Sequence, residues 1–583
     1  MITHKQYDHI IEHQVLVVGG GIAGMLSAIS CSKYTNDIAM VSKGKIGWSG
    51  ATACCGGNAM TICMPEDDPN EWMEKYVIHS DYTVDQEWVK IFIEESYNRA
   101  MGLNELGKRN GKMVYPHDPE NPEKFWRIER TGNKCTIFNL PEAQNILRHE
   151  IIKKSISTYE RISVIQLLCY ENRVVGAVGV HYRTGETYLF KAKSVVLAAG
   201  ACTYSQDLFE VCGEGFAIAY HAGAKMMSFD RGGAISRPRK VMHNGTLFSS
   251  TANSSGYQMG GRMVNRLGED FFKKMTPEMR EAGRLGQNMA IRKELDEGRG
   301  PIYEDYTNLS PYAKNVMKSM RIAQWKRVKS EFNLDPLEEK ICVADGVEQT
   351  YTPDTCNRMG GVAIDHQNMS SVQGLFVVGD NTAPVLAMQH PFGGCELGWA
   401  VLSGSRVGEK VGRYIDEQST LNLSDAWYKS SGEKRLSSLR KYLDNVDGVQ
   451  PDIVKQKIFS CMIPYDVVHS DAAHLQNAIE TINSIRSEYL TKMWARDYHE
   501  LKEAIEVESL LDVSEMILRS ELVRKESRVG VRRKDYPKMD NIHWLKWITI
   551  QKIGNAMILG EEAIPAPYMK APEVIDYPPQ HRV

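Results

Sequence analysis

The chain has 583 residues, of which 42% are hydrophobic and 25% charged, and its formal net charge at pH 7 is -3. This length exceeds a single hydrophobic core and predicts two or more domains. The near-neutral charge argues against nucleic acid as a partner, and the N-terminal apolar stretch is too short for a signal-peptide core or a membrane span. We therefore expect a globular cytoplasmic protein with no membrane span.

The twelve cysteines stand singly, apart from the neighbours Cys54 and Cys55. The sequence contains no C-x-x-C run that could ligate zinc or an iron-sulfur cluster, and no C-x-x-C-H site for haem. We expect reduced thiols and no bound metal. If the protein transfers electrons, it needs an organic cofactor of its own and an electron partner on another chain.

Residues 13–28 run from an apolar strand through Gly19-x-Gly21-x-x-Gly24 into a helix of small and apolar residues. This order is typical of a dinucleotide-binding fingerprint. Gly19 is predicted to make the tight turn, Gly21 to let the backbone approach a pyrophosphate, and Gly24 to let helix and strand pack closely. The helix N-terminus would supply amides to the phosphates.

The second predicted strand, residues 38–41, ends in Ser42 and Lys43 instead of the acidic residue that usually holds a ribose hydroxyl. This ending argues against a plain NAD domain and leaves FAD open. Residues 44–60 are rich in small side chains and include Asn58, which could bond a flavin or a substrate. The segment suits a loop that lies flat against a planar ligand, and a flexible surface loop is the alternative.

Residues 66–112 have the apolar periodicity of an amphipathic helix that packs without chemistry. Strand patterns return between residues 162 and 191, and a further apolar strand ends in Ala199 and Gly200, where backbone would meet the cofactor again. From about residue 235 to 350 the periodicity changes, which predicts an inserted domain that caps the flavin and excludes water.

Residues 374–380 form a predicted strand that delivers Gly379 and Asp380. An ionised carboxylate is a pure acceptor, so Asp380 suits the hydroxyls of a ribityl chain. A Gly-Gly turn then opens a helix whose first turn holds Glu396 and Leu397, and whose N-terminus could face the flavin pyrimidine. Residues 425–550 are mostly charged amphipathic helix, followed by an irregular tail rich in proline.

The predicted fold class is α/β, with a two-dinucleotide-binding-type FAD domain, an inserted α+β capping domain and a C-terminal helical domain. The FAD-binding domain would comprise residues 1–234 and 351–424, on either side of a capping domain at residues 235–350. The helical domain and tail would occupy residues 425–583.

These motifs, spread over nearly the whole chain, resemble the succinate dehydrogenase/fumarate reductase flavoprotein superfamily. The resemblance extends to Met359-Gly360-Gly361, to Gly393-Gly394, and to Glu526-Ser527-Arg528 before Arg533-x-Asp535-Tyr536-Pro537. It implies that FAD is held by Gly19, Gly21, Gly24, Ser42, Lys43, Ser49, Gly50, Ala51, Asn58, Ala199, Gly200, Gly379, Asp380, Glu396 and Leu397.

The departures from the family pattern bear on function. Gly50 stands where respiratory members carry the histidine that links covalently to FAD, which implies a non-covalent cofactor. Cys356 and Pro391 replace a substrate histidine and an arginine, and the capping-domain arginine that donates a proton falls near Tyr257. The histidine after Glu-Ser-Arg is replaced near Val531. A dicarboxylate site needs such residues, so fumarate and succinate are not expected as substrates.

Ser49-Gly50-Ala51, residues 298–303 and a histidine two positions before Phe392 resemble the branch that holds the α subunit of adenylylsulfate reductase. This likeness implies non-covalent FAD and a partner that is a small ferredoxin-like iron-sulfur subunit.

The candidate catalytic residues are His390, Arg358, Arg262 and Tyr257. His390 has the titration range for proton transfer, and Arg358 could clamp an anionic substrate. Arg262 and Tyr257 lie in the capping-domain loop where the family places catalytic groups. The alternatives are a histidine that only shapes its loop, a surface salt bridge for Arg358 and solvent-facing roles for the other two.

The sequence thus predicts an FAD-dependent oxidoreductase subunit that transfers electrons between a small anionic substrate and an iron-sulfur partner. One alternative is a flavin electron-transfer subunit without its own substrate. Another is an enzyme similar to fumarate reductase or L-aspartate oxidase.

Overall fold

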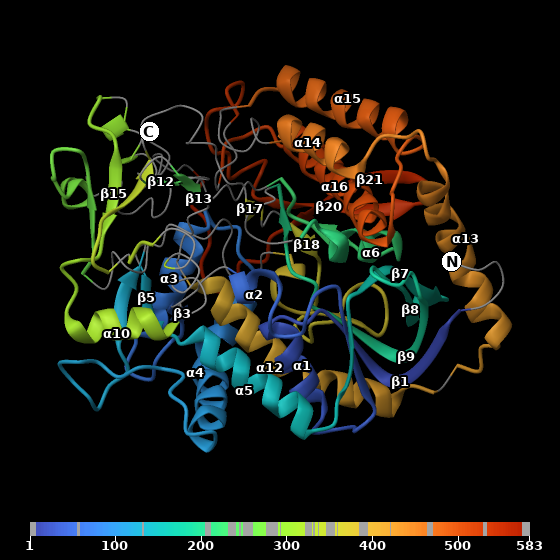
Figure 1. Cartoon of the computed structure of the whole chain (residues 1–583), viewed down its shortest axis with the longest axis horizontal. Coiled ribbons are helices and arrows are strands. Elements are labelled where there is room, and N and C mark those ends of the chain that lie inside the picture. The colour runs from blue at the N-terminus through green and yellow to red at the C-terminus, as the bar shows by residue number, and fades with distance from the viewer. Residues whose placement is uncertain are drawn as a thin grey trace.

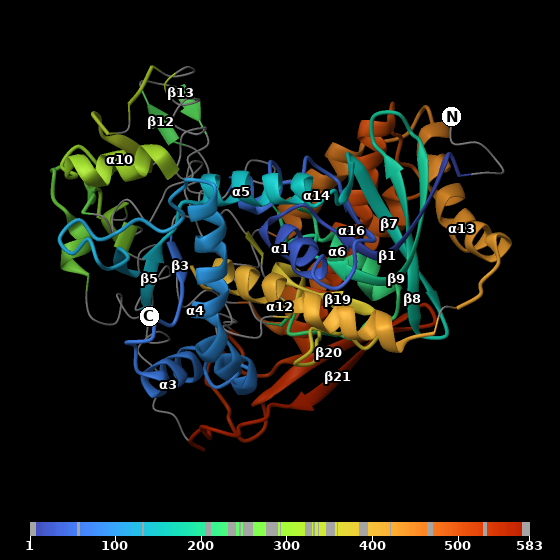
Figure 2. The ribbon, with the colours of Figure 1, turned by 90° about the horizontal axis from the view of Figure 1, so that it is seen from below.

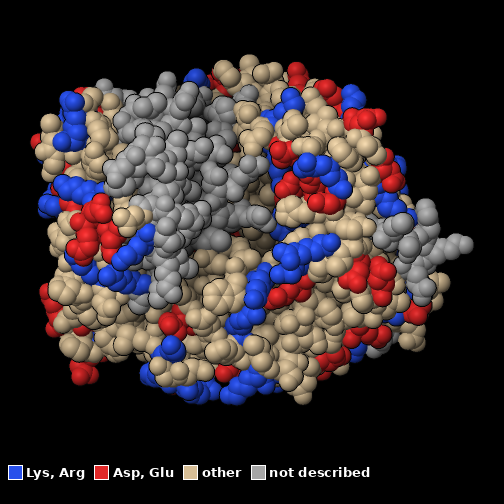
Figure 3. All heavy atoms as spheres, viewed as in Figure 1, with Lys and Arg blue, Asp and Glu red and all other residues tan. Residues whose placement is uncertain are grey.

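The computed structural model describes residues 7–54, 59–130, 133–204, 211–230, 241–243, 246–248, 260–275, 290–291, 293–295, 297–320, 329, 333–335, 337–344, 356–357, 360–383, 394–419, 421–462, 470–528 and 533–573. It is a mixed α/β structure, in which the C-terminal helices lie next to the central sheet, and a smaller unit that includes β15 and α10 lies at the other end of the molecule (Figure 1). Among these residues, no helix is both long and apolar enough to cross a membrane. Figure 3 shows acidic and basic side chains interspersed on one face.

The central sheet has the strand order β6-β2-β1-β9-β8-β7, and β19 pairs with β9. The strands are β1 (His9–Val18), β2 (Ile38–Ser42), β6 (Ser157–Glu160), β7 (Ile162–Tyr170), β8 (Arg173–His181), β9 (Thr187–Leu197) and β19 (Leu375–Val377). Strand β1 runs parallel to β2 and β9, and Val15 aligns with both Ile38 and Ser194. The second half of β1 is fully buried, as expected for a central parallel strand covered on both faces.

Helix α1 (Ile22–Cys31) follows β1 and packs closely on α12 (Cys395–Glu417) (Figure 2). The close approach depends on small residues: a Cβ at Gly404 would lie 2.5 Å from the carbonyl oxygen of Ala23, and one at Gly408 would lie 2.3 Å from the carbonyl carbon of Ser30. The Ser30 hydroxyl donates to the Gly404 carbonyl at 3.0 Å. Helix α5 (Leu140–Lys153) packs on α1 as well.

The segment predicted as one amphipathic helix forms two, α3 (Pro69–His79) and α4 (Gln86–Arg109). The break falls at Asp81 and Tyr82, whose φ angles of 49° and 63° are left-handed. The Asp85 carboxylate then caps α4 by accepting from the amides of Glu87 and Trp88. Apolar periodicity alone did not reveal this turn.

A smaller unit packs against a second sheet, which has three strands. That sheet has the order β3 (Ala59–Thr61), β5 (Asn133–Ile137) and β4 (Arg127–Arg130), and the smaller unit contains β14 (Arg262–Val264), β15 (Ile302–Asp305), β16 (Ile341–Ala344) and α10 (Pro311–Met320). Its other short elements are β12 (Val241–His243), β13 (Thr246–Phe248) and the 3-10 turn Phe271–Lys274. Tyr306, Ala313 and Met317 join Ile128 and Ile137 in one buried cluster.

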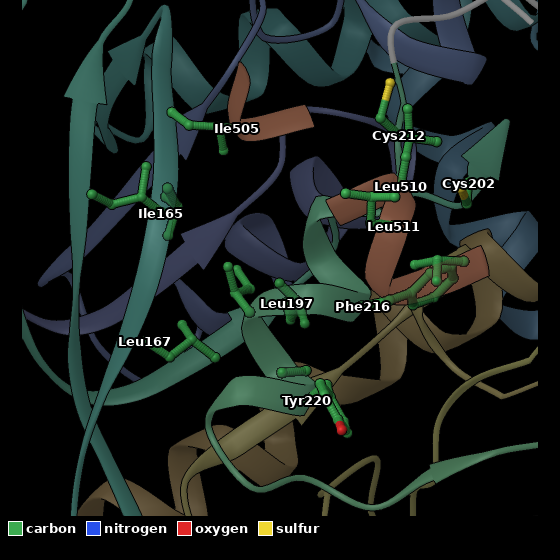
Figure 4. Packing of buried hydrophobic residues seen from close by; sticks show 14 of the residues in the cluster. Ile165, Leu167, Leu197, Cys202, Cys212, Phe216, Tyr220, Ile505, Leu510 and Leu511 are labelled. Carbon is green, nitrogen blue, oxygen red and sulfur yellow. The ribbon is translucent and has the colours of Figure 1, made fainter. Parts of the chain in front are cut away.

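The C-terminal helices are α13 (Asp425–Asp444), α14 (Pro451–Met462), α15 (Ala472–Tyr489) and α16 (Tyr498–Val523). Helix α16 is buried along most of its length and packs against α14, α15 and α6 (Glu214–His221). Its Leu510 and Leu511 share one core with Leu197 of the sheet and Phe216 of α6 (Figure 4). The helical layer and the sheet therefore have a continuous hydrophobic core.

The chain beyond residue 545 is more regular than its composition suggests. Strands β20 (Lys546–Ile553) and β21 (Ala556–Ala563) form a hairpin that adds to β11 (Met226–Met227) and β18 (Gly361–Val362). Residues after the hairpin then lie along α4, where the Gln86 side chain donates to the Met569 carbonyl at 2.7 Å and accepts from the Tyr568 amide at 3.0 Å. The tail thus covers the protein's own surface.

The Glu526-Ser527-Arg528 motif has a structural role. Arg524, Glu526 and Arg528 are fully buried, and Arg524 pairs with both Asp230 and Glu526. Arg528 donates to Glu526 at 2.7 Å and to the carbonyl of Asp81 at 2.7 Å. These contacts tie the end of the helical layer to two distant segments of the chain.

Candidate functional site

A cavity opens at the carboxyl ends of strands β1, β2, β9 and β19, which is where doubly wound sheets bind their ligands. The sequence-predicted residues that line it are Gly19, Gly21, Ser42, Lys43, Ser49, Gly50, Ala51, Ala199, Gly200, Gly379 and Asp380. Residues from five separate parts of the sequence thus meet in one cavity.

The three glycines of the fingerprint are needed for different reasons. A Cβ at Gly19, where φ is +118°, would lie 2.1 Å from the Ala198 carbonyl oxygen, and a Cβ at Gly24 would lie 2.1 Å from the Gly19 carbonyl oxygen. Gly21 has an ordinary φ of -75°, and its Cβ would meet only the Thr52 hydroxyl, at 3.2 Å. Chain packing therefore explains Gly19 and Gly24, whereas Gly21 leaves room for a ligand to approach the backbone.

The N-terminus of helix α1 borders the cavity. Its N-cap residue, Gly21, makes no side-chain cap, and its first turn contains no acidic residue. The amide of Ile22 donates to the Thr52 hydroxyl at 3.1 Å. The helix dipole and its remaining orphan amides favour an anionic group here, as a pyrophosphate would supply.

The loop after β2 reaches the cavity through a left-handed turn. Gly50, with φ of +71°, begins the short helix α2 (Gly50–Cys54), and a Cβ there would meet no atom within 4 Å. Ser49 donates its hydroxyl to the Lys45 carbonyl at 2.9 Å. A Cβ at Gly44 would fall 2.2 Å from the Ser49 hydroxyl, so the loop is tightly folded on itself.

Asn381, which the sequence analysis did not single out, joins two walls of the cavity. It lies in the 3-10 turn Gly379–Asn381, is fully buried, accepts from the Ala199 amide at 2.5 Å and donates to the Gly200 carbonyl at 2.6 Å. The Gly379 amide donates to the Ser403 hydroxyl of α12 at 3.1 Å. These bonds fix the position of the backbone around Gly379 and Asp380.

A network of buried charges forms the wall at the end of β2. We call it the lysine network: Lys43, Glu214, Lys455, Lys502 and Glu506. Lys43 pairs with Glu214 and lies 2.8 Å from Glu506, which also pairs with Lys455 and lies 3.5 Å from Lys502. Lys43, Glu214, Lys502 and Glu506 line the cavity. Carboxylates from α6 and α16 thus lie at the strand end where the fingerprint lacks its acidic residue.

Mutual attraction keeps Lys43 and Glu506 ionised despite burial. Burial disfavours the ammonium of Lys43, but Glu214 and Glu506 outweigh it and raise its pKa well above the usual value. Burial likewise opposes ionisation of Glu506, and Lys43, Lys455 and Lys502 lower its pKa well below the usual range. Burial, with the two glutamates, raises the pKa of the Cys212 thiol nearby, so this cysteine stays protonated and unreactive.

The remaining sequence-predicted residues lie elsewhere. Gly24 supports the cavity from behind by close packing, while Glu396 and Leu397 sit in the first turn of α12 and are not among the described residues that line the cavity. Asn58, Tyr257, Arg358 and His390 lie outside the described residues. At position 356, the backbone of β17 (Cys356–Asn357) pairs with β10 (Cys202–Thr203).

Arg262 is the one candidate catalytic residue whose surroundings the structure describes. It starts β14 in the smaller unit and donates to the fully buried Asp305 at 2.6 Å, while 38% of its own side chain stays exposed. Burial opposes ionisation of Asp305, but hydrogen bonds from Thr307 and Arg262 outweigh it and lower its pKa. Arg262 is therefore a charged, anchored donor, and it is not among the described residues that line the cavity.

The described residues contain no group of three or more His, Cys, Asp or Glu side chains that could hold a metal ion. The glycine-rich turn, the bare helix N-terminus and the convergence of parallel strand ends instead define a dinucleotide-binding α/β protein with a helical layer fused to it.

Comparison with known families identifies the dinucleotide that the protein binds. The family described as "FAD binding domain" matches residues 14–397, and the one described as "Fumarate reductase flavoprotein C-term" matches residues 455–582. The chain belongs to this family of FAD-dependent oxidoreductases, and FAD is its cofactor. The resemblance inferred from the motifs is confirmed.

Relatives match nearly the full length of the chain at low identity. One subunit of the fumarate reductase (CoM/CoB) of Methanothermobacter marburgensis is 25% identical over 557 residues, which cover 91% of this chain and 96% of that protein. A mutant FrdA chain of E. coli quinol fumarate reductase has a TM-score of 0.79 at 18% identity, covering 98% of each chain. Adenylylsulfate reductase from Archaeoglobus fulgidus has a TM-score of 0.72 at 18% identity, covering 98% of this chain and 97% of that one. These two structures show the fold, and the predicted fold class is confirmed.

Proposed function

We propose that this chain is the flavoprotein subunit of a complex, that it holds FAD without a covalent bond, and that it transfers electrons between a small anionic substrate and an iron-sulfur partner protein. The observation that carries the proposal is the cavity at the strand ends. There Gly21 leaves the backbone open to a ligand, and Glu214 and Glu506 lie at the end of β2, where the usual ribose carboxylate is missing.

The cavity residues fit FAD in an extended form. Gly19, Gly21 and the N-terminus of α1 would hold the pyrophosphate, and the carboxylates of Glu214 and Glu506 would accept from the adenosine ribose. Asp380 would accept from the ribityl hydroxyls. When bound, FAD supplies hydride transfer, and the chain supplies its position and its electrostatic surroundings.

Gly50 supports non-covalent binding. The position has a left-handed φ, and no other part of the chain that the structure describes occupies the space where a side chain would project. A residue without a side chain offers no nucleophile to the flavin. Ser49 and Ala51, which flank it and line the cavity, would then contact the flavin through the backbone.

An iron-sulfur partner is supported by chemistry and by a relative. The sequence has no C-x-x-C run for a cluster of its own, so electrons from the flavin need an external acceptor or donor. The Methanothermobacter relative is named as one subunit of its enzyme. A ferredoxin-like subunit is the partner we propose.

A small anion is the substrate class we propose. Arg262 supplies a fixed positive charge in the unit that packs over the second sheet, and Asp305 holds the guanidinium in place. Tyr257, Arg358 and His390 are the further candidates, with His390 as the group that would give or take a proton. The family's dicarboxylate residues are replaced at Cys356 and Pro391, so we propose an anion other than fumarate.

The first test is anaerobic purification of the untagged protein from its host, with a visible spectrum and acid precipitation. We expect flavin in the supernatant and a small iron-sulfur protein that co-purifies. Flavin that stays with the precipitated chain contradicts the non-covalent proposal. A lone yellow protein contradicts the proposed partner.

The second test concerns the substrate. The bound flavin is reduced with dithionite, and its reoxidation by fumarate and by adenylylsulfate is followed in a stopped-flow instrument near 450 nm. We expect fumarate to be inert at the rate of a no-substrate control. Rapid reoxidation by fumarate would establish the relative's named activity and refute the proposal of another anion. Reoxidation by adenylylsulfate would identify that nucleotide as the anion.

A further inference from the structure

A second cavity lies beside the FAD cavity, between strand β7, helix α6 and the helices α13, α15 and α16. Its volume is about 450 Å³, within the range of about 300–1,000 Å³ that is typical of small-molecule sites. Val164, Glu214, Ile218 and Ile505 line both cavities, so the two share a wall. The cavity borders the helical layer, and Arg262, the one candidate substrate residue that the structure describes, does not line it.

The interior of this second cavity is mostly apolar. Strand β7 contributes Ile165 and Leu167, and α16 contributes Ile505; Figure 4 shows these three side chains. Ala217 of α6 and Leu490, just after α15, complete the apolar wall. Such a surface favours a ligand with an aliphatic or aromatic body, because binding removes that apolar surface from water.

The charges inside the cavity are already neutralised in pairs. Arg435 pairs with Glu508, which also accepts from the Tyr442 hydroxyl at 2.6 Å. Arg486 donates to Asp512 at 2.9 Å and to Glu515 at 3.1 Å. A second charged group deep in the cavity would have no partner left, and burying an unpaired charge is costly. The interior therefore selects an uncharged body.

The mouth of the cavity is positive. Lys434 is exposed, lines the cavity and forms no ion pair with any residue that the structure describes. His221, also at the mouth, is held between Asp512 at 2.7 Å and the ammonium of Lys552 at 2.6 Å. Lys434 thus offers a positive charge at the mouth, where the polar end of a bound ligand would reach the solvent.

We propose that this cavity binds a small amphipathic monoanion, with its apolar body between β7 and α16 and its single anionic group beside Lys434. The ligand would be an organic carboxylate or sulfonate with a hydrophobic body. This site is additional to the FAD cavity and does not depend on which substrate the flavin serves.

The experiment uses 1-anilinonaphthalene-8-sulfonate, an aromatic monoanion whose fluorescence rises in apolar sites, with the fully flavin-loaded protein. We expect saturable binding while FAD stays bound, as measured by filtration of released flavin. Lys434→Gln should weaken the affinity about two- to fivefold, the effect of losing one exposed ion pair. Ser438→Trp, which fills the cavity from α13, should abolish the enhancement.

The matched control is Lys441→Gln, which removes an exposed lysine of the same helix away from the cavity and should leave the affinity unchanged. Three outcomes would overturn the proposal. The first is no enhancement in the flavin-loaded protein. The second is release of FAD by the dye, which would make the cavity part of the cofactor site. The third is an affinity that neither Lys434→Gln nor Ser438→Trp alters, because the dye would then bind elsewhere.

Discussion

The ammonium of Lys43, at the end of the second strand, lies 2.8 Å from the carboxylate of Glu506, which belongs to the long helix α16 and follows it by 463 positions. Through this pair the central sheet and the helical layer meet at the wall of the proposed FAD cavity. Since Lys455 and Lys502 also face Glu506, one carboxylate keeps three lysines together.

Removing that carboxylate should destabilise the protein strongly. Glu506→Gln leaves Lys43, Lys455 and Lys502 with Glu214 and the more distant Glu503 as acidic neighbours. Breaking a buried ion pair in this way costs about 3–5 kcal/mol. The measurement is the urea midpoint of the apoprotein, followed by circular dichroism. Glu503→Gln is the control, because Glu503 is half-buried on the same helix and pairs with the exposed His499 at 3.7 Å. Its charge also raises the pKa of Lys455, but less than that of Glu506, so we expect a smaller loss of stability. Equal midpoints for both variants would contradict the role given to the network.

Two alanine substitutions in the fingerprint should separate folding from cofactor binding. Gly21→Ala meets only the Thr52 hydroxyl and should change the apoprotein's unfolding free energy by about 0.5 kcal/mol or less, yet its methyl group should exclude the pyrophosphate and abolish flavin retention. Gly24→Ala places a methyl 2.1 Å from the Gly19 carbonyl oxygen and should lose both stability and flavin. The measurements are flavin content and urea midpoint. Normal flavin content in Gly21→Ala would refute the proposed phosphate site.

Arg262 should affect turnover and leave cofactor content unchanged. Arg262→Gln removes the fixed cation beside Asp305, and we expect at least a roughly tenfold slower flavin reoxidation by whichever anion the substrate screen identifies, at unchanged flavin content. Arg266→Gln is the control, since Arg266 is an exposed arginine just after the same strand. If both variants keep the wild-type rate, Arg262 is only a structural partner of Asp305.

The free energy of unfolding should depend on pH through a histidine that contacts the start of helix α4. The hydrogen bond that the His366 ring donates to the Asp85 carboxylate, at 3.2 Å, raises the pKa of His366 against the opposing effect of burial. A raised pKa means that the stabilisation is complete below the unfolded value of about 6.5 and is lost as the pH rises through the folded value. Because 45% of the histidine side chain is exposed, we expect this bond to add less than about 1 kcal/mol to the free energy of unfolding.

The measurement compares urea midpoints of the wild type and His366→Gln at pH 5.5 and pH 9. The variant should be less stable than the wild type at the lower pH and close to it at the higher. His149→Gln, at an exposed position on α5, controls for the loss of a histidine. A deficit that is the same at both pH values would show that His366 acts by packing on Trp88 instead.

The parts of the FAD cavity that sequence reasoning found are those encoded locally. Gly19 and Gly21 lie in one turn, and Gly379 and Asp380 follow one apolar strand, so their spacing alone predicts that they meet at the strand ends. Glu214, Asn381 and Glu506 were missed because their roles depend on contacts across the fold. The one available signal was the missing acid after the second strand, which called for a carboxylate from elsewhere.

The same distinction holds for the fold. The buried strand at Val15–Val18 was predicted because continuous apolar residues need no partner to be recognised. The break at Asp81 and Tyr82 was missed, since neither residue interrupts the helical spacing of the apolar residues on either side. The hairpin that begins at Lys546 was missed because the prolines that follow it dominated the composition, although Gly554-Asn555 between two apolar stretches is a turn signal.

The position of Glu506 also sets the order in which a newly made chain can acquire its cofactor. The first strand, its glycine turn and Lys43 leave the ribosome early, but the wall that α16 provides is made 463 residues later. At about 5–20 residues per second, that interval is roughly 25–90 s. During this time the nascent sheet presents a pyrophosphate turn with no carboxylate from Glu506 beside it, so we expect flavin loading to be a late event in biosynthesis. A stop codon before α16 would leave a chain that has every glycine of the fingerprint and yet an incomplete cavity.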